Sequence, residues 1–318
     1  MEILLNNAAR ARVLVVGDAM LDRYWFGDVN RISPEAPVPV LVISDNEERA
    51  GGAANVACNI SALGANCDLI SVVGNDDAAQ GLERLLAERG VTTDFIRDKN
   101  HVTTVKLRLL SRNQQLLRAD FEQKPDDVCI VEAMDRFKKH LDSADIVLLS
   151  DYGKGAFRDV DQMIDAARAK GLKVLIDPKG RDFSRYRGAT LITPNRHEFE
   201  DVVGPCASLE SMAIKAAELL KIIEVESLLV TLSDKGMALF NKDGLVFHQK
   251  ARAREVFDVS GAGDTVIGAM AATLAAGAGF QDAVHIANAA AAIVVGKLGV
   301  ATASVDEIML EIEKEDIA

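Results

Sequence analysis

The sequence predicts an α/β fold with a doubly wound, mostly parallel sheet flanked by helices. Short β-branched runs recur along the chain, and segments with apolar residues at helical spacing separate them. These runs indicate buried strands at 11–16, 67–73, 145–150, 172–177, 189–193 and 227–231. No internal repeat and no low-complexity linker interrupts the alternation, so we expect a single domain over residues 1–318.

Two of the intervening segments show why helices are expected. Residues 77–90 and 160–171 carry apolar side chains at intervals of three and four residues. Gly90 and Gly171 close these segments, as glycine does where a helix ends in a left-handed residue. Because a helical crossover returns the chain in its original direction, the strands on either side should be parallel.

Two other segments interrupt the alternation and predict a small β lid. Residues 22–44 and 101–121, approximately, have an extended pattern with proline or polar interruptions, and a turn at 111–114 would make the second a hairpin. The second segment carries four basic residues before its first acid: Lys106, Arg108, Arg112 and Arg118. It is either a solvated strand face or a lid face that meets an anion.

The overall charge is strongly negative. The chain has 36 Lys and Arg against 48 Asp and Glu, a formal charge of −12. This disfavours nucleic acid as a partner, because a phosphate backbone calls for a basic face. No apolar run is long enough to span a bilayer, so we expect no membrane contact. The N-terminal segment lacks the pattern of a secretory signal and the four cysteines have no CxxC spacing, so we expect a cytoplasmic protein.

A glycine-rich turn is the strongest functional signal. The run DVSGAGDT, residues 258–265, precedes an apolar helical pattern. Gly261 and Gly263 permit a tight turn, and the first amides of the following helix would form an anion site. Asp264 at this turn is placed to act as a base. The alternative is that Asp264 only caps the helix.

Two further motifs suggest ligand contacts. Gly51 and Gly52 begin a second loop-to-helix turn, GGAANVA, for which close packing is the alternative explanation. Asn195 and Glu198 lie one helical turn apart and could hold a hydrated magnesium ion or form a capping box. The chain has no Walker loop GxxxxGK[ST], and no GxGxxG fingerprint follows its first strand.

Together these motifs resemble the ribokinase-like (PfkB) carbohydrate kinase family. GGAANVA, NxxE and DVSGAGDT occur in that order across nearly the whole chain. The resemblance implies a ribokinase-like fold, ATP and Mg²⁺ as cofactors, and Asp264 as the general base. It implies that Asn195 and Glu198 organise Mg²⁺ through water. Three residues would supply the amides of an anion hole: Gly261, Ala262 and Gly263.

The resemblance also assigns residues to each substrate. On the sugar side it implies five positions: Asp18, Asp22, Gly51, Gly52 and Asn55. On the nucleotide side it implies Thr231, Ser233 and Asn288, with Ser233 at a position where the family usually has glycine. A monovalent cation such as K⁺ is a candidate activator.

Within the family, the segments GDAMLDRYW, RISPEAPVPV and LRLLSRNQQLLRAD are similar to kinases of D-glycero-D-manno-heptose 7-phosphate. This implies phosphorylation of the anomeric hydroxyl to the β-1,7-bisphosphate, in ADP-heptose synthesis for the lipopolysaccharide inner core. Four cations are candidates for binding the 7-phosphate, with structural salt bridges as the alternative: Arg108, Arg112, Lys154 and Lys179.

Other functions remain open at this point. One is a kinase of another sugar or sugar phosphate, such as fructose, ribose or tagatose 6-phosphate. The other is a non-catalytic regulator that binds a sugar or a nucleotide. We expect either a stand-alone kinase or an excised domain, and a homodimer that pairs through the lid.

Overall fold

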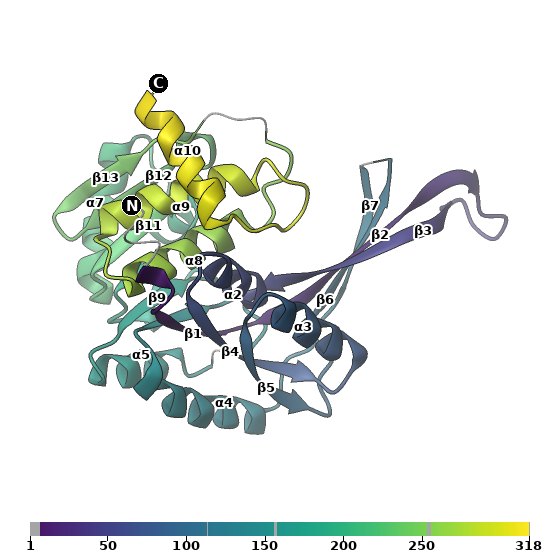
Figure 1. Ribbon diagram of the computed structural model, residues 1–318, viewed down its shortest axis with the longest axis horizontal. Coiled ribbons are helices and arrows are strands. Elements are labelled where there is room, and N and C mark those ends of the chain that lie inside the picture. The colour runs from purple at the N-terminus through teal and green to yellow at the C-terminus, as the bar shows by residue number, and fades with distance from the viewer. Residues whose placement is uncertain (1–6, 113, 156–157, 253–255, 318) are drawn as a thin grey trace.

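A mostly parallel sheet forms the centre of the protein (Figure 1). The computed structural model describes residues 7–112, 114–155, 158–252 and 256–317. The strands of this sheet are β1 (Arg12–Gly17), β4 (Asn66–Gly74), β5 (Thr92–Asp98), β8 (Ile146–Ser150), β9 (Lys173–Asp177), β10 (Leu191–Ile192), β11 (Ser227–Thr231), β12 (Met237–Asn241) and β13 (Gly244–Gln249). In the described part of the chain its nine strands have the order β13-β12-β11-β10-β9-β8-β1-β4-β5. The neighbouring strands from β11 through β10, β9, β8, β1 and β4 to β5 pair in parallel, whereas β12 pairs antiparallel with both β11 and β13.

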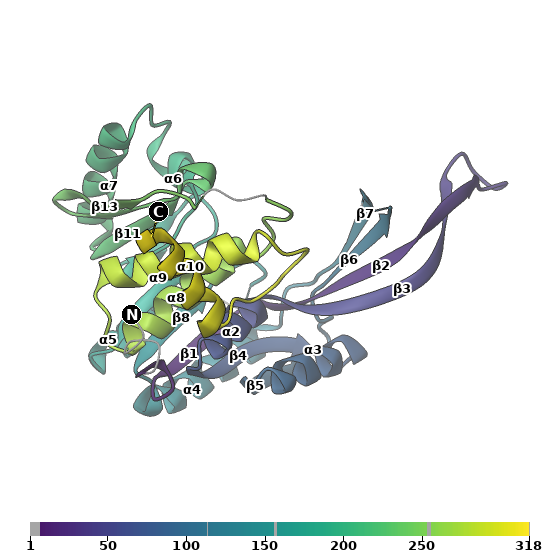
Figure 2. The same ribbon diagram turned by 45° about the horizontal axis from the view of Figure 1, so that its top comes forward.

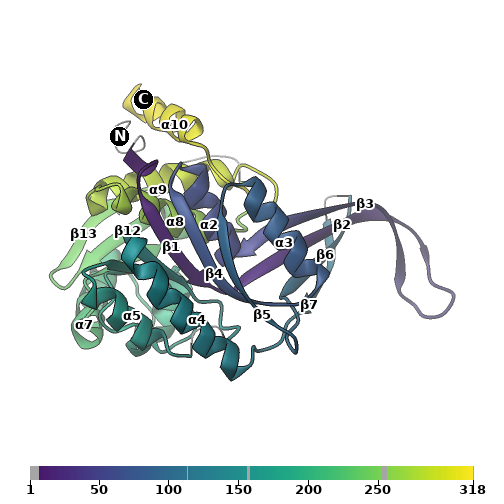
Figure 3. The same ribbon diagram turned by 60° about the horizontal axis from the view of Figure 1, so that its bottom comes forward.

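Helices cover both faces of this sheet (Figures 1 and 3). One face packs against α2 (Ala53–Ala62), α3 (Asp77–Glu88), α8 (Ala262–Ala275), α9 (Phe280–Val294) and α10 (Val305–Ile317). The other packs against α4 (Asp127–His140), α5 (Val160–Ala169), α6 (Arg196–Val203) and α7 (Leu209–Ile223). Short 3₁₀ turns are η1 (Leu141–Ser143), η2 (Phe183–Tyr186) and η3 (Ser233–Lys235).

Strand β1 shows how the sequence builds two cores. Val13 and Val15 belong to the core of the first face, and Leu14 and Val16 belong to the core of the second. Successive side chains of a strand point to opposite faces, so a strand covered on both sides is apolar throughout. The predicted α/β fold is therefore confirmed.

The predicted elements lie where the sequence places them. The six predicted strands are β1, β4, β8, β9, β10 and β11, and they are parallel as expected. Gly90 and Gly171 follow α3 and α5 with φ angles of +74° and +75°. Glycine adopts this left-handed conformation without the strain that a Cβ would bring.

A separate sheet forms the lid (Figure 2). Its strands are β2 (Ala19–Ile32), β3 (Pro39–Gly52), β6 (Val105–Ser111) and β7 (Gln114–Phe121), in the order β3-β2-β6-β7. Two antiparallel hairpins, β2–β3 and β6–β7, join through the parallel pair β2 and β6. Both predicted lid segments contribute to it. Strand β3 continues past the expected boundary to Gly52, so the glycine pair ends a lid strand directly before α2.

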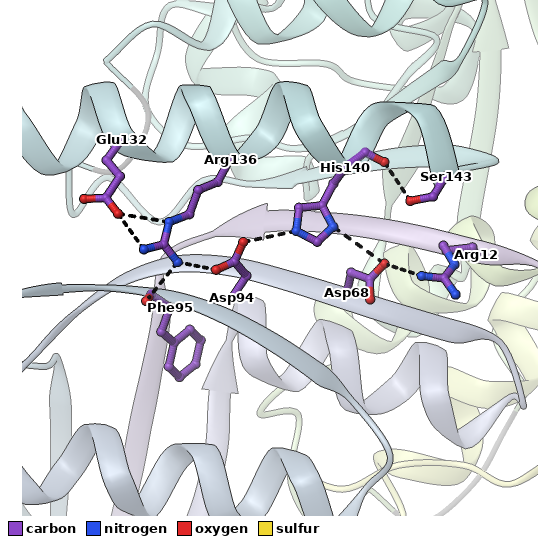
Figure 4. Close-up of polar contacts among 8 residues, drawn as sticks. All are labelled: Arg12, Asp68, Asp94, Phe95, Glu132, Arg136, His140 and Ser143. Atoms are coloured by element: carbon purple, nitrogen blue, oxygen red, sulfur yellow. Dashed lines mark hydrogen bonds and ion pairs between the residues drawn. The ribbon is translucent and has the colours of Figure 1, made fainter.

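A polar network fixes α4 to the sheet (Figure 4). Nε2 of His140 lies 3.1 Å from Oδ2 of Asp94, and Nδ1 lies 3.9 Å from Oδ2 of Asp68. Arg12 donates to Asp68 at 3.0 Å, and Arg136 pairs with Asp94. Since β1 and β4 begin beside this network, it lies at the opposite edge from the carboxyl ends of the strands and has a structural role.

In the residues described here, no helix is both long enough and apolar enough to cross a membrane.

Candidate active site

Polar side chains gather at the carboxyl ends of the parallel strands. Asp151 and Tyr152 follow β8, Asp177 ends β9, Asn195 follows β10 and Thr231 ends β11. Together with the N-terminus of α8 they line a pocket of about 160 Å³. Open α/β sheets bind their ligands in the crevice beyond these strand ends, so this pocket is the candidate active site.

The N-terminus of α8 faces this pocket. Gly261 is its N-cap with φ +77°, and a Cβ there would lie 2.7 Å from Nδ2 of Asn55. Gly261 and Gly263 line the pocket, where the first amides of a helix have no partner within the helix. Ala262 is not among the residues that line the pocket, and its amide donates to the carbonyl of Val259 at 3.2 Å. Gly261 and Gly263 thus lie at the pocket, whereas the predicted anion hole of Gly261, Ala262 and Gly263 stays a prediction.

Asp264 is buried in the wall of the pocket, with 5% of its surface exposed. Oη of Tyr152 donates to its Oδ1, and Nδ2 of Asn55 donates to its Oδ2 at 2.7 Å. Because Gly261 occupies the N-cap, Asp264 is not the cap of α8. Burial raises the pKa of Asp264 to about 6, although both hydrogen bonds act in the opposite direction. Such a carboxylate is suited to accept a proton near neutral pH.

Helix α2 orients Asn55 toward this carboxylate. Nδ2 of Asn59 donates to Oδ1 of Asn55 at 3.1 Å and to its backbone carbonyl at 2.9 Å. The amide oxygen of Asn55 is thereby occupied, and its NH₂ group points to Asp264. The structure thus places Asn55, predicted on the sugar side, in direct contact with the candidate base. Asn59 was not predicted, and its position one turn after Asn55 was the only signal for it.

The base of the lid adds charged groups. Asp22 of β2 pairs with Arg108 of β6 at 2.6 Å, and their side chains are only 5% and 14% exposed. A Cβ at Gly51 would lie 2.5 Å from Oδ2 of Asp22, so this position needs glycine. Nζ of Lys106 lies 5.8 Å from the ring centroid of Tyr152, and desolvation lowers the pKa of its amine. The lid therefore brings a partly buried cation to the site.

Asp18 holds the loop that follows β8. Its Oδ2 accepts hydrogen bonds from the amides of Tyr152 and Lys154, each at 3.0 Å. Gly52 has φ +57°, and a Cβ there would lie 2.5 Å from the carbonyl oxygen of Asp18. Asp18 and Gly52 thus position the chain around the pocket, while their predicted contact with a sugar stays a prediction.

The predicted phosphate-binding cations are dispersed. Nζ of Lys154 contacts Glu122, and Nζ of Lys179 lies 3.0 Å from Oε1 of Glu198. Lys179 therefore lies at the α6 side of the pocket rather than at the lid. Arg112 is exposed at the turn between β6 and β7, with φ +48°. The salt-bridge alternative is thus realised in this structure for Lys154, Lys179 and Arg108.

Asn195 and Glu198 form the capping box of α6. The Asn195 side chain accepts from the Glu198 amide at 2.9 Å, and Oε2 of Glu198 accepts from the Asn195 amide at 3.1 Å. The capping alternative is therefore present. It does not conflict with a metal role, because Glu198 also lines the pocket and Mg²⁺ prefers carboxylate oxygen and keeps several waters.

The predicted nucleotide-side residues lie at the end of β11, in η3 and in α9. Thr231 pairs with Asn195 in an isolated parallel bridge. Ser233 has φ +54°, which gives a physical reason for glycine at this position in the family. Asn288 is buried and donates to the carbonyl of Lys250 at 2.9 Å, so it fixes the chain after β13.

Two pocket residues that the sequence prediction missed are Tyr152 and Asp177. Burial and the negative charges of Asp264 and Glu198 raise the pKa of Asp177 well above its ordinary value. Burial also raises the pKa of Tyr152. Both residues lie at the carboxyl ends of strands that the sequence did predict, and this position was the signal that could have found them.

Comparison with known proteins agrees with this geometry. The family described as pfkB family carbohydrate kinase matches residues 10–307. "Bifunctional protein HldE" of Shigella boydii serotype 18 is 52% identical over 308 residues, covering 97% of this chain and 65% of the relative. The protein of the same name in Aeromonas hydrophila is 53% identical with the same coverage. The chain thus spans slightly less than two thirds of these curated relatives.

Solved structures share the fold. Arabidopsis thaliana ribokinase complexed with ribose and ATP matches with a TM-score of 0.76 and 22% identity, covering 95% of this chain and 99% of that one. Phosphofructokinase-2 from Escherichia coli in complex with potassium matches with a TM-score of 0.80 and 19% identity, covering 96% and 99%. At these identities the likeness shows the fold alone. With the family match over most of its length, the chain belongs to the pfkB family of carbohydrate kinases.

Proposed function

We propose that the chain is an ATP- and Mg²⁺-dependent kinase that phosphorylates the anomeric hydroxyl of D-glycero-D-manno-heptose 7-phosphate. The product would be the β-1,7-bisphosphate, used in ADP-heptose synthesis for the lipopolysaccharide inner core. The observation that carries the proposal is the carboxylate of Asp264, held at the N-terminus of α8 in a pocket at the strand ends. Identity of 52% to HldE proteins over most of the chain supports the choice of sugar.

In this proposal Asp264 takes the proton from the acceptor hydroxyl. Asn55 and Tyr152 orient its carboxylate, and burial raises its pKa to about 6, close to neutral pH. The amides of Gly261 and Gly263 would receive the negative charge of the transferred phosphoryl group. Phosphoryl transfer depends mainly on such positioning and charge stabilisation, since it needs little covalent help from the protein.

Glu198, with Asn195 through water, would hold Mg²⁺. When bound, the ion would neutralise part of the phosphate charge. Lys179 contacts Glu198, so its amine lies where nucleotide phosphates would enter rather than where the 7-phosphate would bind. Thr231, Ser233 and Asn288 are the proposed nucleotide contacts, and K⁺ is the proposed monovalent activator.

The lid supplies the proposed contacts with the sugar phosphate. Asp22 would accept hydrogen bonds from sugar hydroxyls, next to Gly51 and Gly52 at the end of β3. Arg108 and Lys154 are the cations proposed to bind the 7-phosphate at this end, since guanidinium and ammonium groups both suit a phosphate. Binding would require each to exchange its present carboxylate partner for the ligand.

A coupled assay of ADP release tests the function. Wild-type protein is compared on heptose 7-phosphate, the unphosphorylated heptose and fructose 6-phosphate at fixed ATP. We expect the highest kcat/KM with heptose 7-phosphate and a loss of turnover of several orders of magnitude in Asp264→Asn. Equal turnover of fructose 6-phosphate would reassign the substrate. Undiminished turnover in the variant would reject Asp264 as the base, and no turnover with any sugar would favour a binding protein.

We also propose that residues 1–318 form one kinase domain that pairs as a homodimer through the lid. Exposed apolar side chains are concentrated on the lid strands and their turns: Trp25, Ile32, Val38, Val42, Ile43, Leu116, Leu117 and Phe121. Exposed apolar patches of this kind mark interaction surfaces. Arg112 at the hairpin turn would then lie near the second copy. Light scattering should give twice the chain mass, and Leu117→Glu should reduce it to one.

A further inference from the structure

The hydroxyl of Tyr152 donates a hydrogen bond to one carboxylate oxygen of Asp264. Oη donates to Oδ1, while Asn55 donates to Oδ2 at 2.7 Å. Burial raises the pKa of Tyr152 well above its ordinary value, so the phenol keeps its proton and acts as a donor. A carboxylate with one donor on each oxygen cannot rotate freely about its Cβ–Cγ bond, and its remaining lone pairs have a defined direction.

Three elements hold Tyr152 in place. Its amide donates to Oδ2 of Asp18, which follows β1. Its ring lies under Lys106 of the lid strand β6, and its hydroxyl reaches α8. Tyr152 therefore connects the sheet through its amide, and the lid and the helix that carries the candidate base through its side chain.

We propose that Tyr152 is a positioning residue for the kinase reaction, whose hydroxyl fixes the carboxylate of Asp264 in the orientation that receives the acceptor proton. Proton transfer requires correct geometry first and a matched proton affinity second. Tyr152 orients the carboxylate of Asp264 directly, and its hydrogen bond lowers the pKa of Asp264 by stabilising the ionised carboxylate. This inference rests on the proposed function, in which Asp264 is the general base.

Other charges also face Asp264. Asp22 of β2 raises its pKa and Lys106 of β6 lowers it. Asp177 of β9 lies close enough that the charge of Asp264 raises the pKa of Asp177. Removing the hydroxyl of Tyr152 leaves all of these groups in place, so a change in the titration of Asp264 reports on that hydroxyl.

The test is Tyr152→Phe, which keeps the ring and removes only the hydroxyl. Hydrogen bonds to charged groups are strong enough that we expect the acid limb of kcat/KM to move up by about one pH unit or more. In the wild type this limb should lie at about pH 6. At neutral pH kcat should fall on the order of tenfold, recover in part at alkaline pH, and leave KM for ATP unchanged.

The matched control is Tyr24→Phe. Tyr24 is also buried, and its hydroxyl has no hydrogen-bond partner among the described residues. Its loss should leave the acid limb at the wild-type pH. The midpoint of thermal unfolding is measured for both variants. If Tyr152→Phe does not fold, 3-fluorotyrosine at position 152 keeps the packing and, as a stronger donor, should move the limb to lower pH.

A titration without turnover separates this inference from the proposed function. The ¹³C carboxyl resonance of Asp264, assigned with Asp264→Asn, should titrate at about 6 in the wild type and at higher pH in Tyr152→Phe. Equal titration in both proteins would overturn the role of Tyr152, as would an unshifted acid limb with a raised KM for ATP. Retained turnover in Asp264→Asn would instead overturn the proposed function, whatever the titration shows.

Discussion

Replacing Gly261 by alanine should damage the site without removing any functional group from it. Gly261 has φ +77°, where an added Cβ costs about 1–2 kcal/mol in backbone strain. That Cβ would also lie 2.7 Å from Nδ2 of Asn55, the atom that donates to Asp264. Carbon and nitrogen in contact need about 3.5 Å, so the amide must move by roughly 1 Å.

The two effects can be measured separately. The strain should lower the midpoint of thermal unfolding by a few degrees. The displaced amide should reduce kcat on the order of 100-fold, because small misplacements in an active site are costly. Both quantities are obtained from one protein preparation, by calorimetry and by the ADP-release assay.

Gly263→Ala is the matched comparison. Gly263 lies two residues away in the same turn, but its added Cβ would meet nothing within 4 Å, and its φ is not positive. We expect its unfolding midpoint to equal or slightly exceed that of the wild type, because alanine favours a helix more than glycine does. Wild-type stability and kcat in Gly261→Ala would refute the steric reasoning, as would equal loss of stability in both variants.

Two further outcomes follow from the ion pairs at the site. Arg108→Met should raise KM for the sugar phosphate tenfold or more and leave KM for ATP nearly unchanged. It should also lower the free energy of unfolding by roughly 3–5 kcal/mol, because Asp22 stays buried without a partner. Steady-state kinetics measures the KM values and urea unfolding measures the stability, and an equal rise in both KM values would contradict the prediction. Glu198→Gln should raise the Mg²⁺ concentration needed for half-maximal rate and leave KM for the sugar unchanged. A Mg²⁺ titration of the enzyme after chelation measures this concentration. An unchanged Mg²⁺ requirement would argue against Glu198 as the ligand.

Much of the fold could be predicted because it depends on local pattern. Buried parallel strands are apolar throughout, and the helices between them show their period and end at glycine, so the six strands of the sheet core were found within a few residues. The extent of β3 was not predicted, because β3 ends where its pairing with β2 ends, at the pair of Ala19 and Gly52. Register between distant strands has no signal in a single segment.

The candidate site divides in the same way. Gly261, Asp264, Asn195 and Glu198 were found because the geometry they serve is local, a turn at a helix N-terminus. Tyr152 was missed because its role depends on contact with a residue 112 positions away.

The sequence by itself thus determined the α/β class, the family and the motif that carries the candidate base. Only the tertiary structure decided which groups surround that base, since Asn55, Tyr152 and Asp264 come from three elements brought together at the strand ends. It also decided that Lys179 lies with Glu198 and that Arg108 is paired with Asp22. The physical reason is that motifs record local backbone geometry, whereas burial, charge pairing and proton affinity arise from side chains distant in the chain.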